Sequence, residues 1–218
     1  VVARLRAGGA LLLGKANMHE IGINPDGSNA HYGRVCNPWN LEHDPGGSSS
    51  GPAAAVAAGF SPISLGADGG GSIRIPAAHC GVVGLKPTYG RISEFGAAPL
   101  AWSIGNLGPM ATSVEDLTIA YAAIAGPDEK GQKSIFQPPV SIKGWNARDL
   151  NGIKVGIYWE YFNHAQGEIV SANKTSVSQF EGAGAQVVAI EIPELENMRI
   201  AHALTILSEM ASGMTRLP

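Results

Sequence analysis

Cysteine and charge are both scarce in this sequence. Cys36 and Cys80 are the two cysteines among 218 residues; their separation fits no metal-binding motif and allows at most one disulfide. We therefore expect free, buried thiols without a catalytic role, and an intracellular rather than a secreted protein. Charged residues make up 15% of the chain, and the net charge of -3 with a pI near 6.1 shows no basic excess. That balance argues against nucleic acid as a partner and favours a small molecule.

Long hydrophobic runs and a leader-like N-terminus are absent as well. The longest apolar candidate, residues 53–60, is far shorter than the ~18 residues that a membrane span requires. The chain starts at Val1 without the charged and apolar segments of a signal peptide, so we expect that an N-terminal part is missing. The six histidines form no HExxH pair, and we expect neither a metal nor another cofactor. Homodimer formation and peripheral membrane association remain open.

Glycine, by contrast, is abundant. The 29 glycines gather around residues 46–108 without a period, which indicates closely packed backbone rather than a repeat. Two glycine-rich runs frame serines: Gly46-Gly47-Ser48-Ser49-Ser50-Gly51 and Gly69-Gly70-Gly71-Ser72. Such runs alone are most often turns. A serine nucleophile, however, needs a base for its proton and preformed donors for the developing negative charge. If the buried helix and strand between the runs bring them together, Ser72 could be the nucleophile, with backbone N–H groups of residues 69–72 as an oxyanion hole.

The pattern along the chain predicts one α/β domain. We expect helices at 1–7, 51–58, 114–125, about 167–182 and 194–210, and strands at 10–13, 62–65, 153–158 and 186–192, with 14–50 irregular. Thr112-Ser113-Val114-Glu115 is a capping box that would start the third helix. The alternation favours helices on both faces of a largely parallel sheet. We divide the chain into a core at 1–126, a connecting loop at 127–150 and a β-α-β-α continuation of the same domain at 151–218.

The glycine–serine region resembles the amidase signature family of serine hydrolases. The resemblance rests on an ordered set of motifs: Gly46-Gly47-Ser48-Ser49, residues 53–59, Leu65-Gly66, Asp68, Gly70-Gly71-Ser72-Ile73-Arg74, Pro76-Ala77, residues 80–91 and Gly108-Pro109. It implies a layered α/β/α fold around a central mixed, largely parallel sheet, incomplete in this chain. It also implies hydrolysis of amides through an acyl-enzyme.

The same resemblance assigns roles to individual residues. Ser72 would attack the amide carbonyl, and Ser48, held by a cis peptide bond, would relay its proton. The oxyanion hole would consist of the N–H groups of Gly69, Gly70, Gly71 and Ser72. Ser49, Asp68 and Arg74 would give structural support, with Asp68 and Arg74 paired to brace the loop. Gly69 stands where the family usually has Thr or a branched residue, which leaves space beside the oxyanion hole.

The family's catalytic lysine has no counterpart here, because its motif lies upstream of the helix and strand with which this chain opens. Lys15 and Lys86 match other positions of the family. We therefore expect a fragment with two of three catalytic residues, which would hydrolyse amides very poorly by itself. A Ser-His-Asp site is disfavoured because Arg74 takes the last glycine position of the Gly-x-Ser-x-Gly elbow. His79 is interpreted as a packed or pocket-lining residue.

The substrate is less well indicated. Residues 145–150, 158–162 and 192–199 are similar to fatty acid amide hydrolases of the plant type, which implies N-acylethanolamines or other fatty amides as substrates. The alternative within the family is the glutaminase component of a tRNA-dependent amidotransferase. The alternative outside enzymes is a scaffold or binding protein that keeps the fold without the lysine.

Overall fold

The computed structural model describes residues 1–98, 100–134 and 136–215. The chain divides into two compact units, Val1–Ile142 together with His202–Pro218, and Lys143–Ala201. In the described part of the chain no helix has the length and apolar character needed to cross a membrane. Cys36 and Cys80 are both free thiols, as predicted, but Cys80 is buried whereas Cys36 is partly exposed.

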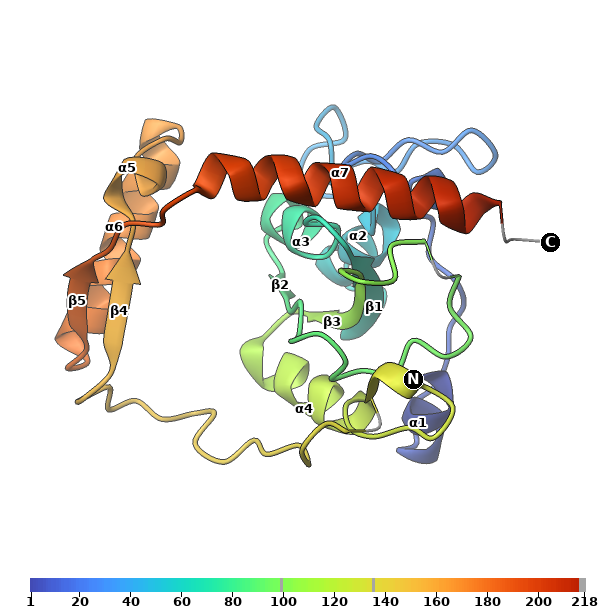
Figure 1. Cartoon of the computed structure of the whole chain (residues 1–218), viewed down its shortest axis with the longest axis horizontal. Coiled ribbons are helices and arrows are strands. Elements are labelled where there is room, and N and C mark those ends of the chain that lie inside the picture. Colours follow the sequence, from blue (N-terminus) through green and yellow to red (C-terminus); the bar gives the residue numbers. More distant parts are fainter. Residues whose placement is uncertain (99, 135, 216–218) are drawn as a thin grey trace. The chain divides into compact units, whose positions relative to one another are not determined.

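The first unit is built on a three-stranded antiparallel sheet. Its strands are β1 (Ile63–Asp68), β2 (Val83–Gly84) and β3 (Asn106–Ala111), in the order β1-β3-β2, with Ile63 opposite Ala111 and Asp68 opposite Asn106. Helices α2 (Ser50–Ala57) and α3 (Arg74–Cys80) pack on one face, and α4 (Val114–Ile124) packs on the other (Figure 1). Helix α1 (Val2–Ala7) packs against α4. The mixed α/β class is confirmed, with helices on both faces of this sheet.

Two hydrophobic clusters form the core of this unit. One consists of Ala53, Ile73, Ala77, Cys80 and Met110, from α2, α3, β3 and the loop before α3. The other consists of Leu5, Ile92, Ile124 and Ala125, with Leu65 and Leu107 of the sheet packed against it. The small side chains of α2 allow the helix to lie close to β1 and to the turn that precedes it.

The second unit contains the predicted alternation of strands and helices. Strands β4 (Lys154–Ile157) and β5 (Gln186–Ala189) pair in parallel, α5 (Trp159–Phe162) and α6 (Gly167–Gly182) lie between them in sequence, and α6 packs on β5. Helix α7 (Leu195–Met214) contributes residues to both units. Within the described ranges, β4 and β5 are the one parallel pair of strands. Strand β3 pairs antiparallel with both β1 and β2.

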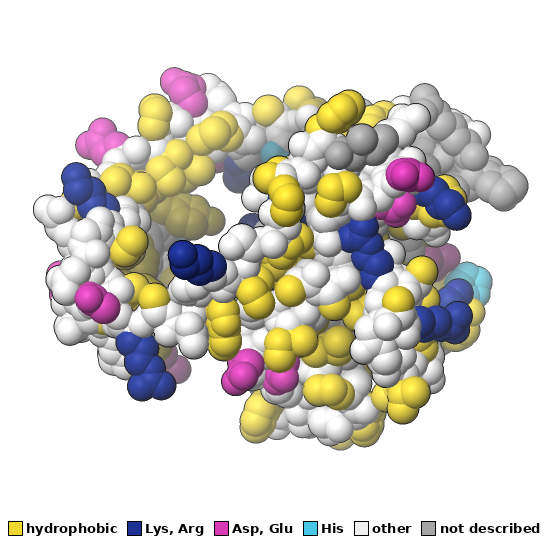
Figure 2. Space-filling view, turned by 90° about the horizontal axis from the view of Figure 1, so that it is seen from below, with side chains coloured by type: hydrophobic (Ala, Val, Ile, Leu, Met, Phe, Trp, Pro, Cys, Tyr) yellow, Lys and Arg dark blue, Asp and Glu magenta, His cyan; other side chains and the backbone are white. Residues whose placement is uncertain are grey.

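Several local predictions need correction. The strand expected at residues 10–13 is wrong: no strand forms there, and Leu11 and Leu13 are 88% and 76% exposed. The N-cap of α4 is Ser113 rather than Thr112, with the Asp116 N–H donating to Ser113 Oγ over 3.0 Å. Helix α3 and the 3-10 turns η1 (Glu20–Gly22) and η2 (Gln132–Ser134) were not anticipated. The face of the molecule in Figure 2 carries many hydrophobic side chains between few charged ones, in line with the low charge content.

Candidate active site

A pocket of about 420 Å³ in the first unit is lined by residues of both glycine–serine runs. Ser48 and Ser72 lie on its wall, together with Asp68 and Gly69. Much of the remaining lining is apolar and includes Met18, Ile21, Phe95, Leu107, Ile206 and Met210. The volume falls in the range of about 300–1,000 Å³ that is typical of small-molecule sites.

The first serine run is positioned by close contacts of its backbone. The peptide bond between Gly47 and Ser48 is cis, as the resemblance implies. A Cβ atom on Gly47 would lie 2.4 Å from the carbonyl oxygen of Asp26, so this position has no room for a side chain. The His19 N–H donates to the Ser48 carbonyl over 3.0 Å. Ser48 is only 3% exposed and directly precedes the N-terminal turn of α2.

The second serine run connects β1 to α3 and is hydrogen bonded to the first. The Ser49 N–H donates to the Ser72 carbonyl over 3.1 Å. The Ser49 hydroxyl donates to the Ala67 carbonyl over 3.3 Å and accepts from the Ala67 N–H over 3.2 Å. Ser49 thus connects the two runs through its backbone N–H and contacts the end of β1 through its hydroxyl.

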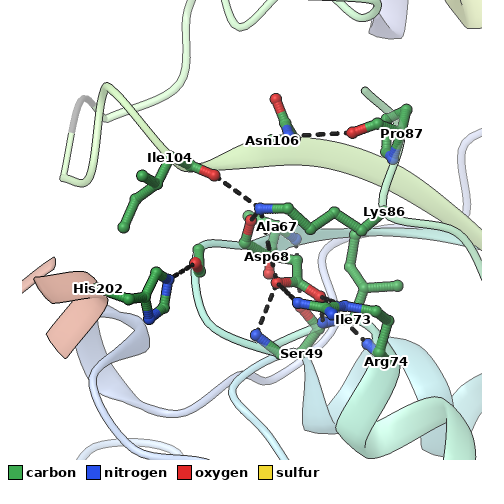
Figure 3. A network of polar contacts seen from close by, with 12 residues as sticks. Ser49, Ala67, Asp68, Ile73, Arg74, Lys86, Pro87, Ile104, Asn106 and His202 are labelled. Atoms are coloured by element: carbon green, nitrogen blue, oxygen red, sulfur yellow. Dashed lines mark hydrogen bonds and ion pairs between the residues drawn. The ribbon is translucent and has the colours of Figure 1, made fainter. Parts of the chain in front are cut away.

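Asp68 organises the loop that carries Ser72. Its carboxylate is fully buried and accepts from the N–H groups of Gly71 (2.7 Å), Ile73 (3.2 Å) and Arg74 (3.4 Å). The Arg74 guanidinium donates to both carboxylate oxygens, over 2.9 and 3.1 Å (Figure 3). Burial alone would raise the pKa of Asp68, but the Arg74 and backbone hydrogen bonds outweigh it and hold the pKa below its ordinary value. Asp68 is therefore a charged brace of the loop.

The backbone donors of the loop divide into two groups. The Gly71 N–H is directed to Asp68, so it supports the loop instead of facing a substrate. The N–H groups of Gly69, Gly70 and Ser72 donate to no acceptor in the residues that the structure describes. A Cβ on Gly71, at φ 125°, would approach Ile75 Cδ1 to 2.6 Å, so the sharp turn needs glycine here.

Four lysines are candidates for a basic group near the serines: Lys15, Lys86, Lys130 and Lys133. Lys15 is exposed, and it is not among the residues that line the pocket. Lys86 donates to the carbonyls of Asp68 (2.8 Å) and Ile104 (2.6 Å), which fixes it behind the loop (Figure 3). Burial lowers the pKa of Lys86, against the opposing charge of Asp68. Lys130 and Lys133 do line the pocket, and no sequence motif indicated either of them.

Lys133 is held as a cation by its neighbours. Its ammonium donates to Glu94 over 2.7 Å and to the Trp102 carbonyl. Partial burial lowers the pKa of Lys133, but the hydrogen bond and charge of Glu94 outweigh that effect, and the pKa is raised. A lysine in this state cannot accept a proton from serine near neutral pH.

His79, interpreted above as a packed or pocket-lining residue, is not among the residues that line the serine pocket. His79 is exposed on α3 and lines a separate pocket with Trp39 and Asp44. No cluster of three or more metal-ligating side chains occurs among residues 1–98, 100–134 and 136–215. His202 of α7 was not anticipated: its Nε2 lies 2.7 Å from the Gly69 carbonyl oxygen (Figure 3). No local motif could have indicated this contact, because the two residues are separated by 133 positions.

Known proteins are similar to this chain in sequence and in fold. The family model described as Amidase matches residues 1–217. A glutamyl-tRNA(Gln) amidotransferase subunit from Symbiobacterium thermophilum is 42% identical over 217 residues, covering 99% of this chain and 44% of that protein. The fatty acid amide hydrolase of Arabidopsis thaliana is 41% identical over 223 residues, covering 99% and 36%. The peptide amidase structure from Stenotrophomonas maltophilia matches with a TM-score of 0.87 and 36% identity, covering 99% and 46%. The chain spans less than half the length of each.

Proposed function

Because the chain belongs to the amidase family, we propose that it supplies the nucleophile and the oxyanion donors of an amide hydrolase. One observation carries this proposal. The two serine runs are joined by the hydrogen bond from the Ser49 N–H to the Ser72 carbonyl, and Ser48 and Ser72 line the same pocket. The same loop as Ser72 has backbone N–H groups that donate to no acceptor among residues 1–98, 100–134 and 136–215, and acyl transfer requires such donors.

In the proposed reaction Ser72 Oγ attacks the amide carbonyl carbon. Ser48 accepts the proton from Ser72 and passes its own proton to a neutral base, so that the alkoxide never accumulates. The N–H groups of Gly69, Gly70 and Ser72 stabilise the oxyanion. Ser48 then returns a proton to the departing amine, which leaves an acyl-Ser72 ester for water to hydrolyse.

The base is proposed to be a lysine outside the residues of this chain. Lys133 is a cation paired with Glu94. Lys86 is bound to two carbonyl oxygens and does not line the pocket. We therefore expect the isolated 218-residue chain to hydrolyse amides very slowly.

The apolar wall of the pocket favours a substrate with an apolar acyl group. Residues such as Phe95, Leu107 and Met210 offer hydrocarbon surface, and burying each methylene of an acyl chain is worth about 0.8 kcal/mol. N-acylethanolamines or other fatty amides fit that surface, and the likeness to the Arabidopsis fatty acid amide hydrolase supports the same class.

Glutamine is the second candidate substrate, and Lys130 is the observation that favours it. Lys130 is exposed at the pocket, with its ammonium 5.6 Å from the centre of the Phe95 ring. A cation at this place could bind the carboxylate of a free amino acid. The likeness to the Symbiobacterium amidotransferase protein supports this alternative.

Turnover by the full-length protein distinguishes these proposals. We expect faster hydrolysis of an N-acylethanolamine than of glutamine, with Ser72→Ala inactive on both and Ser171→Ala, an exposed serine of α6, unchanged. Faster release of ammonia from glutamine would transfer the assignment to the glutaminase class. Undiminished turnover by Ser72→Ala would overturn the hydrolase mechanism itself.

A further inference from the structure

The first observation concerns the contact between α7 and the nucleophile loop. His202 Nε2 lies 2.7 Å from the Gly69 carbonyl oxygen. A carbonyl oxygen only accepts hydrogen bonds, so Nε2 carries the proton and donates. Figure 3 shows the His202 ring reaching from α7 to the loop beside Asp68.

The second observation is that this peptide unit has little else to hold it. The Gly69 carbonyl and the Gly70 N–H belong to one planar trans peptide and point in opposite directions. Asp68 fixes the following part of the loop through Gly71 and Arg74. Among the described residues, His202 is the only hydrogen-bond partner of the Gly69–Gly70 peptide. Glycine on both sides leaves this peptide free to rotate unless something binds it.

The third observation concerns the side chains of α7 that lie beside these two glycines. A Cβ on Gly70 would lie 3.1 Å from His202 Cε1, and a Cβ on Gly69 would lie 3.2 Å from Cδ1 of Ile206. Ile206 follows His202 by one turn of α7. The space that the glycine at 69 leaves beside the oxyanion hole is therefore filled by side chains of α7.

We propose that His202 is a positioning residue, which holds the Gly69–Gly70 peptide with the Gly70 N–H directed toward the oxyanion formed on Ser72. The inference rests on the proposed amide hydrolysis and assigns the element that orients one of its donors. His202 itself contacts neither the nucleophile nor the substrate in this assignment. Losing one oxyanion donor costs about 10²–10³-fold in kcat, and a donor that is merely misoriented part of the time costs less, about 10–100-fold.

The test compares His202→Leu, which removes the donor, with His202→Gln, which keeps an N–H donor on the side chain, in the full-length protein. His79→Leu is the matched control, because His79 is another exposed helix histidine outside the serine pocket. We expect His202→Leu to lower kcat about 10–100-fold with KM nearly unchanged. A trifluoromethyl ketone analogue of the substrate, which forms an oxyanion on Ser72, should bind more weakly by the same factor. His202→Gln should recover most of both losses.

The outcomes separate this inference from the proposed function. A wild-type protein that neither hydrolyses amides nor forms the ketone adduct overturns both. An active wild type with a His202→Leu variant within 2-fold in kcat overturns the role of His202 alone. The role of His202 is also overturned if His202→Leu loses kcat but keeps its affinity for the ketone. It is overturned as well if His202→Leu loses both and a His202→Gln variant with the thermal stability of wild type recovers neither.

Discussion

Replacing Asp68 by Asn should damage this protein more than its small change in shape suggests. The buried carboxylate accepts three backbone N–H groups and two from Arg74. An amide keeps one acceptor oxygen, and its NH₂ group would face donors where the second oxygen was. If the oxygen remains toward Ile73, the Gly71 N–H and one Arg74 N–H lose their acceptor.

The size of the effect follows from these contacts. Hydrogen bonds to a charged group are worth about 1.5–3 kcal/mol each, and breaking a buried ion pair costs about 3–5 kcal/mol. Because the Arg74 side chain is 55% exposed and can be solvated, we expect a loss near the lower end, about 3 kcal/mol in the free energy of unfolding. Arg74→Gln should cost less, about 1 kcal/mol, since the carboxylate keeps its backbone donors.

In the full-length protein, urea denaturation of wild type and both variants measures the stability change, and the labelling rate of Ser72 by a fluorophosphonate measures the effect on the loop. We expect the Asp68→Asn variant to label far more slowly than Arg74→Gln at a urea concentration where both are folded. An Asp68→Asn variant that loses less than about 1 kcal/mol and labels at the wild-type rate would show that the carboxylate does not brace the loop.

Three further measurements follow from the structure. The pKa of Asp68 is lowered from 3.8 in the folded state. The ionised carboxylate therefore contributes its full stability above pH 3.8, and this stability is lost as the pH falls through the lower pKa of the folded state. Wild type should lose stability below about pH 4 more steeply than Asp68→Asn, and parallel acid titrations of the two proteins would contradict this. Gly47→Ala should fail to fold or lose Ser72 labelling, because the new Cβ would meet a carbonyl oxygen at 2.4 Å, whereas Gly167→Ala, with open space around it, should behave as wild type in circular dichroism and labelling. Burial raises the pKa of Cys80 to about 11, so iodoacetamide at pH 8 should modify Cys36, which is partly exposed, and spare Cys80, as peptide mass mapping would show.

Local sequence signals were sufficient where a structure is decided by neighbouring residues. Helix α2, expected at 51–58 from Pro52 and Gly59, spans Ser50–Ala57 and so differs by one residue at each end, and the parallel β4–β5 pair follows from alternation along the chain. The strand expected at 10–13 failed because strand formation needs a partner, and Leu11 finds none in the described residues. Apolar character predicts burial only when another element covers it.

The same distinction applies to the site. Asp68 and Arg74 are six positions apart, so their ion pair could be anticipated from the loop alone. Glu94 and Lys133 are 39 positions apart, and their pairing depends on how distant loops fold over the pocket. Gly71 was expected to face the substrate, but its N–H is taken by a carboxylate whose orientation no motif records.

The contact between His202 and Gly69 also has a consequence for protein synthesis. The two residues are 133 positions apart. At about 5–20 residues per second, the ribosome therefore adds Gly69 to the nascent chain roughly 7–27 s before it adds His202. During that interval both serine runs, β1 and α3 are already synthesised, while the helix that contacts the loop is not. A nascent chain thus contains Ser72 for many seconds before the Gly69–Gly70 peptide can gain its partner on α7.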